Sequence, residues 1–268
     1  MTVALAPPPA STRPIVEMGL AAAIPIYNEE TAITGVVAGV RRHVSHVVVV
    51  DDGSTDKGAR AAVAAGAEVV LHDENLGKGV GLQTALAWAK EHREVTNLVF
   101  IDGDGQHDPA DIPRMLAVMQ RRDLDIMVGS RFLGQHNAPL YRLFGLHVLT
   151  ASAGLGSGVY MTDSQSGFRI LSRRAIDRLE LKEESFAVES EMQFEAAKKG
   201  LRLGEIPIEI RYTGPARRSP VAHGVSVLLR TILMTARRRP LRLPLLVATP
   251  FLALRIGTRR HAVGPIAS

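Results

Sequence analysis

The 268-residue sequence contains no cysteine, so disulfide frameworks, thiolate metal sites and cysteine nucleophiles are excluded. That composition fits a reducing compartment, and we expect a cytoplasmic protein. The N-terminus is rich in proline but lacks the apolar segment of a secretory signal, so residues 1–18 are predicted to form a disordered arm. No G-x-G-x-x-G pattern follows the first predicted strand, which argues against a dinucleotide site, and no G-x-x-x-x-G-K-[ST] pattern occurs.

Acidic residues are absent from the C-terminal segment. Residues 211–268 contain 11 arginines and no lysine, aspartate or glutamate, whereas residues 1–210 contain 21 basic and 27 acidic residues. The net charge of +5 therefore combines a mildly acidic body with a basic tail. Such a tail is typical of proteins that bind nucleic acid, anionic lipid or a phosphorylated substrate. Tyr212 and Phe251 are its only aromatic residues, which argues against a nucleic-acid-binding module and against nucleic acid as a partner.

A hydrophobic run long enough to cross a membrane is also missing from this segment. Residues 243–254 carry no charge, but twelve helical residues cover only about 18 Å where a span needs roughly 20 residues, and Pro244 and Pro250 interrupt the run. Residues 225–236 form a second apolar stretch. We therefore expect residues 214–268 to form amphipathic helices that lie against the inner face of the membrane, with arginines at the level of the lipid headgroups. The alternative is that they pack on the core as a C-terminal helix pair.

Apolar runs and helical stretches alternate along the rest of the chain. With 46% hydrophobic residues, the chain can form one α/β core. The runs at 47–50 and 98–101 are typical of buried parallel strands. Further strands are predicted at 21–26, 68–71, 125–128, 163–171 and 204–212, with helices at 27–42, 54–65 (capped by Ser54 or Thr55), 81–90, from Pro109, 140–155 and 188–199. This order predicts a doubly wound, mostly parallel sheet with the loops after its strands along one edge.

Carboxylates follow both of these apolar runs. Asp51 and Asp52 come after the first run, and Asp102 and Asp104 after the second, at the edge where open α/β sheets bind ligands. Side chains two residues apart in an extended segment point the same way, so Asp102 and Asp104 can share one Mg²⁺ or Mn²⁺, to which Gln106 could add a carbonyl oxygen. Such a metal would neutralise the charge on a departing diphosphate. The alternative is that the aspartates are only turn residues and helix N-caps.

Three further side chains are candidates for nucleotide contacts. Asp52, at a strand end, suits a hydrogen bond to a ribose hydroxyl or a base N–H. Lys78, in a G-K-G turn, and Arg131 are candidate phosphate contacts, although each could equally be a solvated surface charge. Together with the paired carboxylates, they predict an enzyme that handles a nucleoside diphosphate through a metal.

Seven motifs occur in an order that resembles the family 2 inverting glycosyltransferases. They are I-P-I-Y-N-E-E (24–30), V-V-D-D-G-S-T-D (49–56), N-L-G-K-G (75–79), D-G-D-G-Q-H-D-P (102–109), G-S-R-F (129–132), D-S-Q-S-G-F-R (163–169) and E-I-P-I-E-I-R-Y (205–212). The chain is most similar to the branch of polyprenyl-phosphate sugar synthases, such as dolichyl-phosphate mannose synthase. The resemblance implies a GT-A fold with a Rossmann-like nucleotide-binding half and a catalytic domain over residues 19–213. Many relatives continue into transmembrane helices after this point, and the present sequence departs from that pattern.

The resemblance also implies partners and residue roles. A nucleoside-diphosphate sugar would be the donor and a polyprenyl phosphate the acceptor. The candidate nucleotide contacts are Pro25, Tyr27, Glu29, Asp52, Lys78 and Asp102, and the metal and diphosphate motif is Asp102, Asp104 and Gln106. The candidate catalytic residues are Asp104, Arg131, Asp163 and Arg169. Arg131 would lie near the donor and acceptor phosphates, and Arg169 in the loop on the acceptor side.

The acceptor decides whether the reaction needs a general base. A phosphomonoester, with a second pKa of about 6, is already anionic at neutral pH, so arginines that align two anions matter more than a base. A hydroxyl acceptor requires a base, for which Asp163, Glu189 and Glu191 are the available carboxylates. A soluble family 2 enzyme that acts on a hydroxyl of a small molecule or saccharide is therefore the alternative prediction. The sequence leaves open the sugar and the choice between UDP and GDP.

Overall fold

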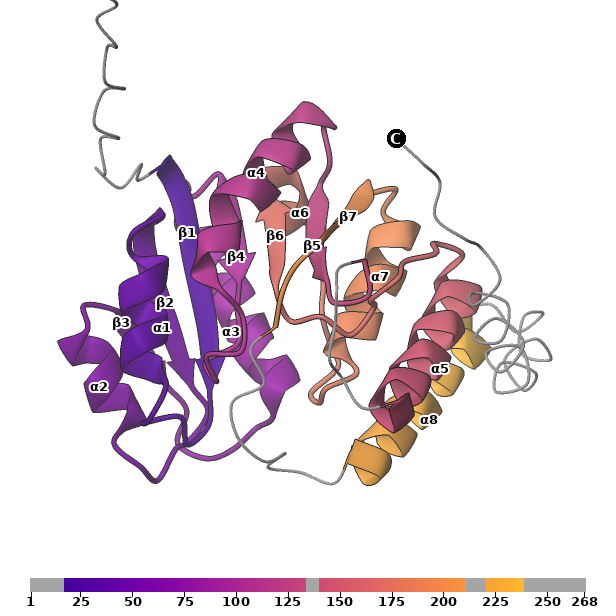
Figure 1. Ribbon diagram of the computed structural model, residues 1–268, viewed down its shortest axis with the longest axis horizontal. Coiled ribbons are helices and arrows are strands. Elements are labelled where there is room, and N and C mark those ends of the chain that lie inside the picture. Colours follow the sequence, from indigo (N-terminus) through magenta and orange to yellow (C-terminus); the bar gives the residue numbers. More distant parts are fainter. Residues whose placement is uncertain (1–16, 134–139, 211–219, 239–268) are drawn as a thin grey trace, which may run out of the picture.

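The computed structural model describes residues 17–133, 140–210 and 220–238. Seven strands form one sheet in the order β3-β2-β1-β4-β6-β5-β7 (Figure 1). They are β1 (Glu17–Ile26), β2 (Val44–Asp51), β3 (Glu68–Leu71), β4 (Asn97–Phe100), β5 (Ile126–Ser130), β6 (Arg169–Ser172) and β7 (Leu203–Pro207). Only the pairings of β6 with β4 and β5 are antiparallel. The predicted mostly parallel α/β sheet is therefore confirmed.

Helices cover both faces of this sheet (Figure 1). They are α1 (Ile33–Val40), α2 (Gly58–Ala64), α3 (Lys78–Glu91), α4 (Ile112–Arg121), α5 (Leu140–Ser157), α6 (Arg173–Arg178), α7 (Val188–Lys198) and α8 (Pro220–Arg238), with a 3₁₀ turn η1 (Pro109–Asp111) before α4. Ala22 and Ile24 of β1 belong to a core shared with α1 and α4, whereas Ala21 and Ala23 belong to a core shared with α3, α6 and α7. A strand whose side chains alternate between two apolar cores is buried on both faces, which is why these strands read as continuous hydrophobic runs.

The loops after β1 and β2 hold one another, which shortens two predicted helices. Asn28 has a positive φ of 58°, and its side-chain oxygen accepts hydrogen bonds from the backbone N–H of Thr55 (2.9 Å) and Asp56 (3.3 Å). Ser54 does not cap α2, because its hydroxyl accepts from the N–H of Asn28 at 2.9 Å. As a result α1 begins at Ile33 rather than near residue 27, and α2 begins at Gly58 rather than at residue 54.

The second half of the sheet contains a strand, β6, whose antiparallel direction the sequence did not predict. The run 163–171 was expected to be one strand, but only Arg169–Ser172 joins the sheet, because the preceding residues form a buried loop. The strand expected at 204–212 is β7, and it ends at Pro207. Helix α6 was also not predicted. Its N-cap is Ser172, whose hydroxyl accepts from the N–H of Ala175 at 3.2 Å.

Helices α5 and α8 pack side by side at one end of the molecule (Figure 1). Val227, Thr231 and Thr235, spaced one turn apart on α8, are buried. One face of α8 therefore packs against the protein, and the membrane position of residues 214–268 stays a prediction. No helix in those ranges is long and apolar enough to cross a membrane. The apolar run 243–254 lies outside the described residues, as do residues 1–16 of the predicted arm. Residues 17 and 18, which were assigned to that arm, belong to β1 instead.

Candidate active site

Lys78 stands between two carboxylates at the carboxyl end of the sheet. Its ammonium nitrogen lies 2.8 Å from Asp102 Oδ1, in the loop after β4, and 2.7 Å from Glu189 Oε1, in the first turn of α7. Burial alone would lower the pKa of Lys78, but the two carboxylates outweigh it and raise that pKa. Burial would raise the pKa of Asp102, but Lys78 and His107 hold it far below its ordinary value. Lys78 and Asp102 are therefore both charged at neutral pH.

Asp104 is the second carboxylate of the loop after β4. Gly105, with a φ of 75°, turns the chain so that Asp104 Oδ1 accepts from the N–H of Gln106 at 3.0 Å. Burial and the nearby charge of Asp102 raise the pKa of Asp104. Two hard oxygen donors that repel each other can accommodate a divalent cation with a few protein ligands, the remainder being water or diphosphate oxygens. Among the described residues, no group of three or more His, Cys, Asp or Glu side chains is arranged to hold a metal alone.

The loop before β6 presses directly on Asp102. A Cβ atom added at Gly167 would lie 2.4 Å from Asp102 Oδ2, which is closer than real Cβ contacts come. On another side, His107 Nε2 lies 3.8 Å from Asp102 Oδ2, and the His107 ring packs 5.3 Å from the Phe168 ring. The sequence motif around residues 166–169 is therefore in contact with the metal motif, and glycine is the residue that permits the contact.

The Asp52 carboxylate makes its hydrogen bonds within the protein and does not face solvent. Its Oδ1 accepts from the N–H of Leu76 at 2.9 Å and lies 2.8 Å from His72 Nδ1, and its Oδ2 accepts from the N–H of Gly77 at 2.8 Å. Only 4% of the residue is exposed. The sequence predicted a contact with ribose or base, whereas in this structure the carboxylate fixes the turn that leads into Lys78.

The remaining predicted nucleotide contacts lie in and beside the loop after β1. Tyr27 is 40% exposed, and Pro25 and Glu29 are half-buried. Pro25 lies against α3, where a Cβ at Gly81 would lie 3.5 Å from the Pro25 Cβ. These three residues and Lys78 come from neighbouring parallel elements, so the structure brings them to the same edge of the sheet as Asp102.

Arg131 is held by Asp163 through a two-pronged ion pair. Arg131 Nε lies 2.6 Å from Asp163 Oδ2, Nη2 lies 2.7 Å from Oδ1, and the backbone N–H of Arg131 also donates to Oδ2 at 3.1 Å. The Asp163 side chain is fully buried, whereas a fifth of the Arg131 side chain is exposed. Burial would raise the pKa of Asp163, but Arg131 outweighs it and lowers that pKa. Asp163 therefore orients Arg131 and is a weak base.

Arg169 was expected to meet an anionic acceptor, but its position differs from that expectation. It is 1% exposed, and its guanidinium donates to the backbone carbonyls of Ser164 (2.7 Å), Ser166 (2.9 Å) and Glu189 (3.2 Å). Burial lowers the pKa of Arg169. The side chain therefore ties the loop before β6 to the start of α7. Arg169 therefore holds the backbone behind the candidate site and does not line its surface.

The other carboxylates of this half are engaged as well. Glu191 Oε2 accepts from the N–H of Lys182 (2.9 Å) and of Glu183 (2.7 Å), and so holds the chain before α7. Glu189 is 3% exposed, and the oxygen that does not meet Lys78 is buried without a hydrogen-bond partner. Glu205 of β7 accepts hydrogen bonds from Thr162 and from the backbone N–H of Asp163. Glu205 opens the motif at 205–212 but was not among the predicted site residues, because its hydrogen-bond partners lie more than 40 residues away in the sequence.

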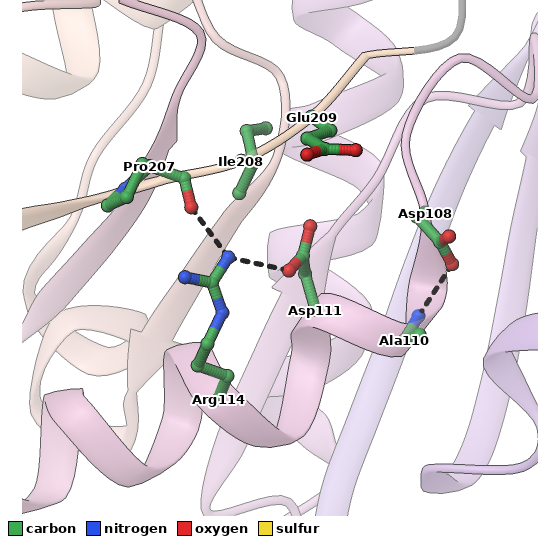
Figure 2. A pocket seen from close by; sticks show the side chains of 7 residues that line it. All are labelled: Asp108, Ala110, Asp111, Arg114, Pro207, Ile208 and Glu209. Carbon is green, nitrogen blue, oxygen red and sulfur yellow. Dashed lines mark hydrogen bonds and ion pairs between the residues drawn. The ribbon is translucent and has the colours of Figure 1, made fainter. Parts of the chain in front are cut away.

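A surface hollow of about 510 Å³ lies beside the site, between the start of α4 and the end of β7 (Figure 2). Arg114 crosses its floor, donating to Asp111 Oδ1 at 2.7 Å and to the carbonyl of Pro207 at 2.6 Å. The lining residues are Asp108, Ala110, Asp111, Arg114, Pro207, Ile208 and Glu209. None of the predicted site residues lines this hollow, so it is a neighbour of the carboxylate cluster and not the cluster itself.

Comparisons with known proteins found a matching family model, similar sequences and a similar fold. The family model described as glycosyl transferase family 2 matches residues 22–180. The chain is 31% identical to the UDP-N-acetylglucosamine–dolichyl-phosphate N-acetylglucosaminyltransferase of Methanococcus voltae, over 79% of this chain and 94% of the relative. It is 30% identical to the undecaprenyl-phosphate mannosyltransferase of Micrococcus luteus, over 69% of this chain and 80% of the relative. Its fold is similar to that of glucosyl-3-phosphoglycerate synthase from Mycobacterium tuberculosis in complex with Mn²⁺, UDP and glucosyl-3-phosphoglycerate, with a TM-score of 0.65 and 21% identity over 81% of this chain and 80% of that one.

Proposed function

The chain belongs to glycosyl transferase family 2, and on this premise we propose that it transfers a sugar, with inversion, from a nucleoside-diphosphate sugar to a polyprenyl phosphate. The observation that carries the choice of acceptor is the state of the three carboxylates that could act as a base. Asp163 is paired with Arg131, Glu189 with Lys78, and Glu191 with backbone N–H groups. The lowered pKa of Asp163 makes it a poor proton acceptor, and the contacts of Glu189 and Glu191 already engage those two carboxylates. A phosphate acceptor needs no general base.

Arg131 is the residue that would align the reacting anions. Its planar guanidinium can bind phosphate oxygens in a fixed orientation, and Asp163 locks one edge of it. An arginine held in one direction lowers the entropic barrier of bringing two anions into line. The relatives from Methanococcus voltae and Micrococcus luteus support the same acceptor class, because their names contain dolichyl phosphate and undecaprenyl phosphate.

The donor and its metal would bind at the loop after β4. Asp102, Asp104 and Gln106 would hold Mg²⁺ or Mn²⁺ together with the diphosphate. When bound, the metal supplies positive charge that stabilises the departing nucleoside diphosphate. The repulsion between the two carboxylates supports this assignment, as does the Mn²⁺ and UDP bound by the mycobacterial neighbour.

The nucleotide would lie along the loops after β1 and β2. Tyr27 offers an exposed ring, and Pro25 and Glu29 border it. Asp52 would act by holding the turn at 76–77, which directs Lys78 toward the diphosphate. Lys78 would contribute a positive charge that is largely buried.

The C-terminal segment 214–268 would lie against the inner face of the cytoplasmic membrane. Leu229 and Leu233, one turn apart on α8, are 56% and 55% exposed, while Val227 and Thr231 face the protein. An apolar stripe on the outer side of a helix that is rich in arginine matches an interfacial position. Each arginine near an anionic surface contributes on the order of 1 kcal/mol to binding.

The test is transfer itself. The purified protein is incubated with UDP- and GDP-sugars and Mn²⁺, with and without a short polyprenyl phosphate, and the anomeric configuration of the product is read by NMR. We expect transfer only when the lipid phosphate is present, with inversion at the anomeric carbon. Transfer to a sugar or a small hydroxylated acceptor, with none to the polyprenyl phosphate, would instead support the soluble family 2 alternative.

A further inference from the structure

Glu205 lies in the middle of β7, away from the residues assigned above to donor or metal, and its side chain accepts hydrogen bonds from Thr162 and Asp163. We propose that Glu205 is a positioning residue for Arg131, acting through the Thr162–Asp163 segment. The proposal rests on the role of Arg131 given under the proposed function. It concerns how this chain fixes the direction of that guanidinium.

The first link is between Glu205 and the loop before β6. Glu205 Oε2 accepts from the N–H of Thr162 at 2.7 Å. Glu205 Oε1 accepts from the N–H of Asp163 at 2.9 Å and from the Thr162 hydroxyl at 3.1 Å. The two carboxylate oxygens therefore each accept from one of two consecutive backbone N–H groups. These bonds fix the direction in which the Asp163 side chain leaves the backbone.

The second link is between Asp163 and Arg131. The buried Asp163 carboxylate receives Nε, Nη2 and the backbone N–H of Arg131 at 2.6, 2.7 and 3.1 Å. The Ser130 and Thr162 hydroxyls, 2.6 Å apart, connect the same two segments. A rotation of the Asp163 backbone would turn its carboxylate and carry the guanidinium with it.

The two ends of this chain of contacts stand on one rigid support. Strands β5 and β7 are parallel neighbours, and Val128 pairs with Glu205 while Ser130 pairs with Pro207. Arg131 directly follows β5. Glu205 therefore attaches the loop before β6 to the same pair of strands that carries Arg131. The direction of the guanidinium is thus set relative to the sheet and not by the loop alone.

This position requires a carboxylate. Glu205 receives three donors and its charge is half-buried, so both oxygens must be acceptors. Glutamine has the same size but turns an NH₂ group toward at least one backbone N–H, and two donors cannot bond. Glu205→Gln should therefore turn the Thr162–Asp163 segment while leaving the apolar core untouched.

The first experiment is a double-mutant cycle on transfer to a polyprenyl phosphate, with Glu205→Gln, Arg131→Ala and the double variant. We expect Glu205→Gln alone to lower kcat by about tenfold to a hundredfold, since a small misplacement of an aligning group acts on the reaction step. In the Arg131→Ala background it should change kcat less than about twofold, because the group that it positions is gone. An equal loss in both backgrounds would overturn the proposal. Glu209→Gln, an exposed carboxylate four residues further along, is the control and should leave kcat unchanged.

The second experiment does not depend on the acceptor. The Arg131 Nε–H resonance of ¹⁵N-labelled protein, assigned by its loss in Arg131→Lys, reports the 2.6 Å bond to Asp163. We expect it to be protected from solvent exchange in the native protein and in Glu209→Gln, and to shift or broaden in Glu205→Gln. Glu205→Asp, which keeps the charge but shortens the side chain, should have the same effect and serves if Glu205→Gln fails to fold. An unchanged resonance in the Glu205 variants overturns the proposal. A changed resonance in a protein that transfers nothing to polyprenyl phosphate leaves the proposal standing and overturns only the proposed function.

Discussion

At the scale of single residues, the site is a set of paired charges. Lys78 forms ion pairs with Asp102 and Glu189, and Arg131 forms one with Asp163. Leaving one member of such a buried pair without its partner typically costs about 3–5 kcal/mol. Variants at these positions should therefore be compared with changes that keep the charge or the shape.

The carboxylates of the loop after β4 are expected to be essential for transfer. Asp102→Ala and Asp104→Ala should each lower kcat/KM by about 10³-fold, because several kcal/mol of charge stabilisation on the departing diphosphate depends on the metal that they hold. The circular dichroism spectrum should stay native. Initial rates are measured across a Mn²⁺ series and in chelator. Full activity of both variants in chelator would contradict the metal assignment.

A methyl group at residue 167 is expected to disturb Asp102. Gly167→Ala brings a Cβ to within 2.4 Å of the Asp102 carboxylate, so either the loop or the carboxylate must move. We expect weaker binding of Mn²⁺ with nucleoside diphosphate, and a rate reduced on the order of tenfold. Gly35→Ala is the matched control, since a Cβ at Gly35 has no atom within 4 Å. Titration calorimetry distinguishes the two variants, and equal affinities would contradict the close contact.

The Asp163 ion pair predicts a pH dependence of stability. The pKa of Asp163 lies below its ordinary value of 3.8 in the folded protein. A depressed pKa contributes stability above the unfolded value and loses it as the pH falls through the folded value. The free energy of unfolding should thus fall below about pH 4, with up to about 1.4 kcal/mol per pH unit from this one carboxyl. Urea titrations between pH 2.5 and 6 measure the free energy of unfolding, whose slope against pH should be smaller for Asp163→Asn. Asp73→Asn, at an exposed position, should keep the native slope.

At the scale of elements, the sequence identified strands where an apolar run ends in acidic residues. Val47–Val50 and the run before Asp102 are buried on both faces, so their hydrophobicity is continuous and easy to recognise. The segment 163–168 misled the prediction, because Asp163, Ser164 and Ser166 are buried with ion pairs and hydrogen bonds instead of apolar packing. Short-range patterns carry no information on such partners, since Asp163 and Glu205 are 42 residues apart.

The same limit applies to residue roles. The sequence assigned Asp52 and Arg169 to the candidate site because their motifs adjoin strand ends. It could not tell whether these side chains turn outward to a ligand or inward to the backbone, since that depends on loops whose partners come from other elements.

The turn held by Asp52 gives a prediction at this scale. Asp52→Ala removes the acceptor of the Leu76 and Gly77 N–H groups, so the segment that carries Lys78 should loosen. We expect the affinity for the nucleoside diphosphate to fall by about 1–3 kcal/mol, or roughly tenfold to a hundredfold, through the loss of a buried acceptor. Metal binding to Asp102 and Asp104 should change far less. Fluorescence titration with UDP and GDP measures the first quantity, and unchanged affinity for both would refute the prediction.

At the scale of the whole molecule, the arginine-rich tail and the exposed leucines of α8 predict binding to anionic membranes. Co-sedimentation with anionic vesicles should be strong at low salt and weak at high salt, because the attraction is screened. Leu229→Ser with Leu233→Ser should weaken binding at every salt concentration, since it removes apolar contacts and no charge. Truncation after Pro240 should reduce transfer to polyprenyl phosphate. Indifference to anionic vesicles at low salt would contradict the membrane assignment.

The reversed strand β6 divides the sheet into two pieces that are each continuous in sequence. Strands β3-β2-β1-β4 come from residues before Asp123, and β6-β5-β7 come from residues after it. The pieces meet along the β4–β6 ladder and at the Lys78–Glu189 ion pair, so the candidate site lies across the boundary between them. Arg131, Asp163 and Glu205 all belong to the second piece. Asp123 itself has a positive φ of 51° and an 85% exposed side chain. The enzyme should therefore tolerate being cut there into two co-expressed fragments, which regain activity by complementation and whose reassembly would report directly on that boundary.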